Sequence, residues 1–205
     1  MHTDRLVCKT MSNTREYIID QAYSLFLSRS YEAVSISDIS KAIGFTKGAL
    51  YHHFTNKEEL FKAVIDKYLL ISELGISASN ITLEVLIEEI IKKARDTMDC
   101  IFGQNPTFIP INFLALIIDA YRHYPGFSSN KLNFSTNEVN KIKSVLDYAI
   151  ERGEIRSDIN SSLMATNFFS LNMSLTHNLL HNNSPELAIE LLRDQLNELY
   201  KIIKT

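Results

Sequence analysis

The chain has 205 residues, of which 45% are hydrophobic, and a formal net charge of -3. This length is enough for one or two domains with a real core, and the hydrophobic fraction argues against a disordered chain. The sequence shows no apolar run of membrane-spanning length and no signal-peptide pattern, and its charge gives no overall basic signal for nucleic acid. Its two cysteines, Cys8 and Cys100, lie in a polar N-terminal segment and a predicted helix, so we expect no structural disulfide and a reducing cytoplasmic location.

The N-terminal segment precedes a first predicted helix. Residues 1–12 are polar and irregular, so we expect a disordered arm, within which Met11 is an alternative translation start to Met1. Residues 14–29 predict a helix, because apolar residues recur there at helical spacing. The inward positions of this helix are Ile18, Ala22, Leu25 and Phe26.

Residues 35–54 are the most informative part of the chain, because they predict two short helices joined by a tight turn. Ser35 is placed to cap the first helix, with Asp38 at its third position in a variant of the capping box. Gly44 ends this helix, since glycine adopts the left-handed conformation that a helix end often needs, and Thr46 caps the next one. Two short helices joined in this way are typical of the helix-turn-helix unit, whose second helix enters the DNA major groove.

The second helix of this pair has an inward face, which Leu50 and Phe54 share because they are four residues apart. The opposite face carries a cation, a glycine that permits close approach, a phenol and an imidazole, which suit phosphates and base edges. A third helix starts at Thr55 or Asn56, and its positive end with Lys57 suits a phosphate group. The alternative is an ordinary three-helix cluster with a polar surface. The predicted DNA-binding residues are Ser35, Ser37, Thr46, Lys47, Gly48, Tyr51, His52, His53 and Lys57.

The stretch ISDISKAIGFTKGALYHHFTNKEELF resembles the DNA-binding signature of the TetR/AcrR family of bacterial transcriptional regulators. The resemblance extends over about residues 14–65 and departs from the family at Ser30, where glycine is usual before an aromatic such as Tyr31. It implies a regulator, by family tendency a repressor, that dimerises through its last two helices and senses small, often apolar effectors. The matching residues are Ile39, Gly44, Lys47, Gly48, Leu50, Tyr51, His53, Phe54, Lys57, Glu59 and Leu60.

The rest of the chain also favours helices, and strand signals are nearly absent. We therefore expect an all-α fold of about nine helices, with an N-terminal three-helix head and a C-terminal helical bundle. The predicted domains are a helix-turn-helix domain over residues 13–58 and an effector-binding and dimerisation domain over residues 59–205. Beyond the head, helices are predicted at about 56–73, 82–102, 110–124, 136–152 and 161–181, with a turn at 152–158 and a last helix that includes Ile189 and Ile203.

The last two predicted helices favour a homodimer. The final helix has apolar residues at alternating three- and four-residue steps, and the helix before it is apolar on more than one side. A helix that is apolar all round needs burial on both sides, which indicates a partner chain. The alternative is an intramolecular hairpin that packs only on its own domain. The predicted interface residues are Phe168, Leu175, Leu192, Leu196, Leu199 and Ile203.

Residues 98–134 are rich in aromatic side chains, which are suited to a cavity between helices. The alternative is ordinary core packing, and the expectation of a pocket for a small apolar or amphipathic effector rests chiefly on the family resemblance. The predicted effector-binding residues are Phe102, Phe113, Tyr121, Phe169, Met173 and His177.

Metal and catalytic sites are not predicted. His177 and His181 have metal-ligand spacing but no nearby cysteine or acidic partner, and no catalytic constellation or cofactor-binding fingerprint occurs. We therefore expect no enzyme activity, no metal and no cofactor. The sequence predicts a homodimeric regulator of a palindromic double-stranded DNA operator, with no membrane partner. The alternative is a helical small-molecule binding protein without a DNA role.

Overall fold

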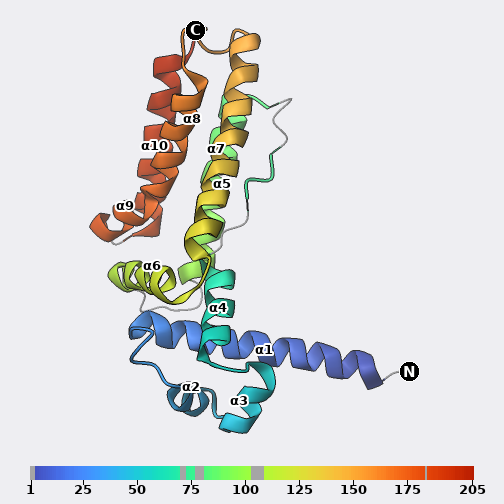
Figure 1. Ribbon diagram of the computed structural model, residues 1–205. Helices are drawn as coiled ribbons and strands as arrows, with labels where there is room; N and C mark the ends of the chain where they lie inside the picture. The colour runs from blue at the N-terminus through green and yellow to red at the C-terminus, as the bar shows by residue number, and fades with distance from the viewer. Residues whose placement is uncertain (1–2, 70–72, 77–80, 103–108, 183) are drawn as a thin grey trace. The chain divides into compact units, whose positions relative to one another are not determined.

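The computed structural model of the chain describes residues 3–69, 73–76, 81–102, 109–182 and 184–205, and their side chains except at 3–13, 102 and 182. The predicted all-α class is confirmed, because these residues form ten helical segments and one isolated bridge between Ile155 and Lys204 (Figure 1). Within the described ranges no helix combines the length and apolar character needed to cross a membrane. The helices are α1 (Thr3–Ser28), α2 (Ile36–Ile43), α3 (Lys47–His53), α4 (Lys57–Tyr68), α5 (Leu83–Phe102), α6 (Pro110–His123), α7 (Phe127–Glu151), α8 (Ser161–Met173), α9 (Leu175–Asn182) and α10 (Pro185–Ile203).

Several helix boundaries differ from those predicted. Helix α1 begins at Thr3 rather than at residue 14, because no proline or glycine interrupts residues 3–13. Helix α7 begins at Phe127, directly after the break at Pro125 and Gly126, and not at 136. The helix predicted at 161–181 is divided at Ser174, whose hydroxyl donates to the Leu171 carbonyl at 2.7 Å and competes with the helical ladder.

The described helices form two compact units. The first unit holds α1 to α4 together with α6, and the second holds α5 and α7 to α10. In the first unit α1 contacts α2, α4 and α6, and its core includes the rings of Phe26, Tyr31 and Phe61. The domain boundary predicted between residues 58 and 59 falls inside α4, all of which belongs to the first unit.

The second unit is built around α10, which contacts α5, α8 and α9. The turn predicted at 152–158 is confirmed, with Gly153 in the left-handed region at φ 69°. Glu154 in this turn accepts the Leu83 N–H at 2.8 Å, the Tyr200 hydroxyl at 3.2 Å and an Arg152 N–H at 2.8 Å. Burial acts to raise the pKa of Glu154, but these hydrogen bonds outweigh it and lower the pKa below its ordinary value. Glu154 therefore ties the turn to the start of α5 and to α10.

Candidate nucleic-acid interface

The start of α2 has the predicted capping box. The Ser35 hydroxyl accepts the Asp38 N–H at 3.1 Å, and the Asp38 carboxylate accepts the Ser35 N–H at 2.9 Å and also its hydroxyl. These hydrogen bonds from Ser35 lower the pKa of Asp38 below its ordinary value. Because the Ser35 hydroxyl both donates and accepts within the cap, its first role is to fix where α2 begins.

A tight turn sets the direction of α3. Gly44 ends α2 at φ 71°, a left-handed conformation that glycine adopts without a steric penalty, and its N–H reaches the carbonyls of Lys41 and Ser40. Two residues later the Thr46 hydroxyl oxygen accepts the Ala49 N–H at 3.2 Å and caps α3. The predicted helix-turn-helix is therefore present, and local capping interactions define both of its helices.

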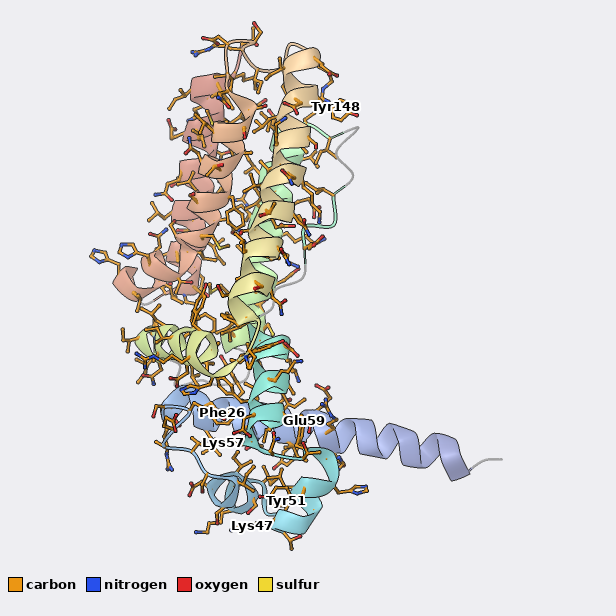
Figure 2. The ribbon with its side chains drawn as sticks, viewed as in Figure 1. Phe26, Lys47, Tyr51, Lys57, Glu59 and Tyr148 are labelled. Carbon is orange, nitrogen blue, oxygen red and sulfur yellow. The ribbon has the colours of Figure 1, made fainter. Side chains whose placement is uncertain are left out.

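Helix α3 is held from one side only. Leu50 is fully buried and Phe54, at its end, is 1% exposed, while the Arg15 guanidinium of α1 lies 4.6 Å from the Phe54 ring centre. On the opposite side Lys47 and Tyr51 extend outward (Figure 2), and Tyr51 is 49% exposed. An exposed phenol next to an exposed ammonium group is suited to phosphate and base-edge contacts.

The other predicted contact residues of α2 and α3 surround this face. Thr46, Gly48 and His52 are exposed, and Ser37 and His53 are partly exposed. The rings of His52 and His53 are 5.5 Å apart in a T-shaped arrangement, so they point in different directions. Among the residues with described side chains, no group of three or more His, Cys, Asp or Glu side chains is arranged to hold a metal ion.

Helix α4 starts from Asn56, whose side chain accepts the Glu59 N–H at 2.7 Å. The Glu59 carboxylate reaches back to the N–H and the hydroxyl of Thr55, each at 2.7 Å, and the pKa of Glu59 is lowered by these bonds. Lys57 lies at the first helical position, but its ammonium group donates to the Tyr31 carbonyl at 3.1 Å. This predicted phosphate contact is therefore engaged within its own unit.

The residues predicted to bind an effector belong to different units. Phe113 is buried and Tyr121 is 55% exposed on α6 of the first unit. In the second unit Phe169 is partly exposed, and Met173 and His177 are exposed. The side chain of Phe102 lies outside the described residues. An effector site formed by these residues stays a prediction.

The residues predicted to form the dimer interface face the interior of the second unit. Phe168, Leu192, Leu196 and Ile203 are fully buried, Leu175 is 6% exposed, and Leu199 is partly exposed. Side chains that one chain already buries offer little surface to a second chain. Their burial within one chain agrees with the hairpin alternative, and a dimer interface formed by these residues stays a prediction.

The sequence patterns do not identify one residue that supports the helix-turn-helix head. Asp119 of α6 is 7% exposed and accepts the N–H of Tyr31 at 2.7 Å, although the two residues are 88 positions apart. No local pattern signals such a pair, because a lone aspartate in a helix usually lies on a solvated face. Only the packing of α6 on α1 brings the carboxylate to the head.

Comparison with known proteins finds similar sequences among bacterial regulators. The family described as "Bacterial regulatory proteins, tetR family" matches residues 18–64. The Transposon Tn10 TetC protein of Escherichia coli is 29% identical over 162 residues, which are 76% of this chain and 77% of that protein. The transcriptional repressor ComR of Escherichia coli K12 is 40% identical over 75 residues, which are 34% of this chain and 36% of that protein. The structure of the SmeT–triclosan complex shares the fold with a TM-score of 0.62 at 18% identity, over 94% of this chain and 92% of that one.

Proposed function

We propose that this chain, which belongs to the TetR family of bacterial transcriptional regulators, is a homodimeric repressor that binds a palindromic operator and leaves it when a small effector binds. The family consists of DNA-binding regulators rather than enzymes. One observation carries the proposal: Lys47, Gly48 and Tyr51 are exposed on α3, while the other side of the same helix is buried at Leu50.

Gly48 adds an argument from energetics. Glycine inside a helix costs roughly 0.5–1 kcal/mol relative to alanine, so its presence in α3 needs a reason. A Cβ atom at this position would meet only the Thr46 hydroxyl oxygen, at 3.9 Å, so packing within the described protein does not require glycine. We attribute Gly48 to close approach of a DNA strand to the backbone of α3.

Repression and effector response are supported by relatives. ComR is named a transcriptional repressor, and SmeT forms a complex with triclosan. We propose an apolar or amphipathic effector for this chain. An effector that prefers the released form lowers operator affinity by the ratio of its affinities for the two forms, typically about 5- to 150-fold.

The proposed dimer uses the outer faces of α8 and α10, which contact each other along the second unit (Figure 1). Leu187, Leu191 and Ile202 of α10 are 53%, 38% and 66% exposed, and Leu163 of α8 is 65% exposed. The three α10 residues are separated by one and by three helical turns, so they share one face. A second copy of the chain would bury this stripe, and two heads held by a two-fold axis would read two half-sites.

The test is fluorescence anisotropy of the full chain with duplex DNA from its own upstream region, with scrambled duplex and Tyr51→Ala as controls. We expect saturation at two protomers per site, preference for the native duplex and weaker binding at higher salt. The competing function is a helical small-molecule binding protein without a DNA role. Equal and weak binding to both duplexes across tiled upstream fragments would favour that competitor.

A further inference from the structure

Tyr31 occupies the turn between α1 and α2 and is 4% exposed. Its ring lies 4.5 Å from that of Phe61 on α4 and 4.4 Å from that of His123 on α6, measured between ring centres. Burial raises the pKa of its hydroxyl to about 12, with the nearby Glu58 carboxylate as the next cause. The ring of Phe26 on α1 lies 5.9 Å from the same ring, so three helices of the first unit meet at one side chain, four residues before the Ser35 cap of α2.

The main chain of Tyr31 is held from both sides. Its N–H donates to the buried Asp119 carboxylate of α6 at 2.7 Å, and its carbonyl accepts from Lys57 of α4 at 3.1 Å. A buried carboxylate is costly unless hydrogen bonds compensate it, and a charge-assisted bond to a main-chain N–H is among the stronger kinds. The hydrogen bond between Asp119 and Tyr31 thus joins α6 to the turn that leads into α2.

Two further contacts join the end of α6 to the same unit. The His123 imidazole lies 3.6 Å from the Glu32 carboxylate, whose side chain is 73% exposed. The hydroxyl of Tyr124, which follows α6, donates to Asp66 of α4 at 2.8 Å. Asp119 differs from both, because it alone of these acidic partners is buried and because it holds backbone rather than a side chain.

We infer that Asp119 is a positioning residue that couples α6 to the DNA-binding helices through the main chain of Tyr31. A displacement of α6 must either carry the turn and the start of α2 with it or break this hydrogen bond. The recognition surface therefore depends on where α6 lies. This inference rests on the proposed function, because it assigns the coupling element of a regulator whose DNA affinity is adjustable.

The first arm of the experiment uses amide hydrogen exchange of the free full-length protein. The Tyr31 amide exchanges slowly in the wild type and in Asp119→Asn, whose side-chain oxygen still accepts the N–H. In Asp119→Ala it exchanges at least about tenfold faster, because the acceptor is lost. The control is Glu32→Gln, which removes an exposed carboxylate of the same cluster and leaves the Tyr31 amide protected. A rapidly exchanging Tyr31 amide in the wild type overturns the inference.

The second arm adds operator DNA and follows exchange in α6, which is not itself a predicted DNA contact. Coupling is reciprocal, so DNA bound at α3 changes the exchange of residues 110–123 in the wild type and in Asp119→Asn, and not in Asp119→Ala. An unchanged α6 response in Asp119→Ala, or no response in the wild type, overturns the inference. If the Tyr31 amide exchanges slowly but the protein binds no operator, the hydrogen bond between Asp119 and Tyr31 is supported and the proposed function is contradicted instead.

Discussion

The ammonium group of Lys57 lies 3.1 Å from the carbonyl oxygen of Tyr31 and 4.0 Å from the centre of its ring. The sequence predicts a phosphate contact for the same lysine, since it opens α4 beside the recognition helix. The two roles have different consequences for the salt dependence of DNA binding. A lysine that neutralises a phosphate releases counterions, whereas a lysine that positions a turn does not.

We predict that Lys57→Met weakens operator binding and leaves the slope of log K against log salt unchanged. Methionine keeps much of the apolar stem over the Tyr31 ring and removes the bond to the carbonyl. Lys47→Met is the matched comparison, because Lys47 is exposed on α3 and its loss lowers the slope by about 1. Anisotropy titrations at four salt concentrations measure both slopes. Equal reductions for the two variants would place Lys57 on a phosphate.

Local chemistry explains why the head is predictable from sequence. Ser35 with Asp38, Gly44 and Thr46 each act within four residues along the chain, and the structure places all four as predicted. The inward positions Leu50 and Phe54 also follow from helical spacing alone. Capping and amphipathic patterns need no knowledge of the rest of the fold.

Long-range packing explains what the sequence does not reveal. The period of Leu192, Leu196 and Ile203 identifies a buried stripe, but period alone does not say whether the same chain or a second chain buries it. The bond from Tyr31 to Asp119 joins residues 88 positions apart, and no short motif contains both. The break at Ser174 depends on a single hydroxyl, which sequence patterns rarely resolve.

Gly48→Ala is predicted to change stability and function in opposite directions. Alanine at this helical position stabilises the fold by roughly 0.5–1 kcal/mol, since the added Cβ meets only Thr46 at 3.9 Å. Operator affinity falls, because the same methyl group stands where a DNA strand approaches. Thermal unfolding and anisotropy measure the two effects. Gly44→Ala is the contrasting variant, because its φ of 71° makes alanine destabilising by about 1 kcal/mol. A gain in stability with unchanged operator affinity would remove Gly48 from the DNA face.

Substitutions at two leucines of α10 distinguish the effect of core packing from the effect of the proposed dimer interface. Leu196 is fully buried within the chain, so Leu196→Glu places a charge in the core and unfolds the protein, at a cost of about 4 kcal/mol or more. Leu191 is 38% exposed on the outer stripe, so Leu191→Glu keeps the helical circular dichroism and yields a monomer. Light scattering gives the mass of each variant. A Leu191→Glu protein that stays dimeric would move the interface away from this stripe.

The capping box of α2 predicts a response to acid. Hydrogen bonds from Ser35 lower the pKa of Asp38 from its ordinary 3.8, so the folded state binds this proton less readily than the unfolded chain. The resulting stability is fully present above pH 3.8 and is lost as the pH falls through the lower, folded-state pKa. Ser35→Ala removes both side-chain bonds of the cap, so the variant is less stable than the wild type at pH 7 and the difference narrows below pH 3.8. Thermal unfolding of both proteins between pH 3 and 7 measures this difference, with Ser37→Ala as the control. A difference that stays constant across this range would show that the bond from the Ser35 hydroxyl to the Asp38 carboxylate does not contribute to stability.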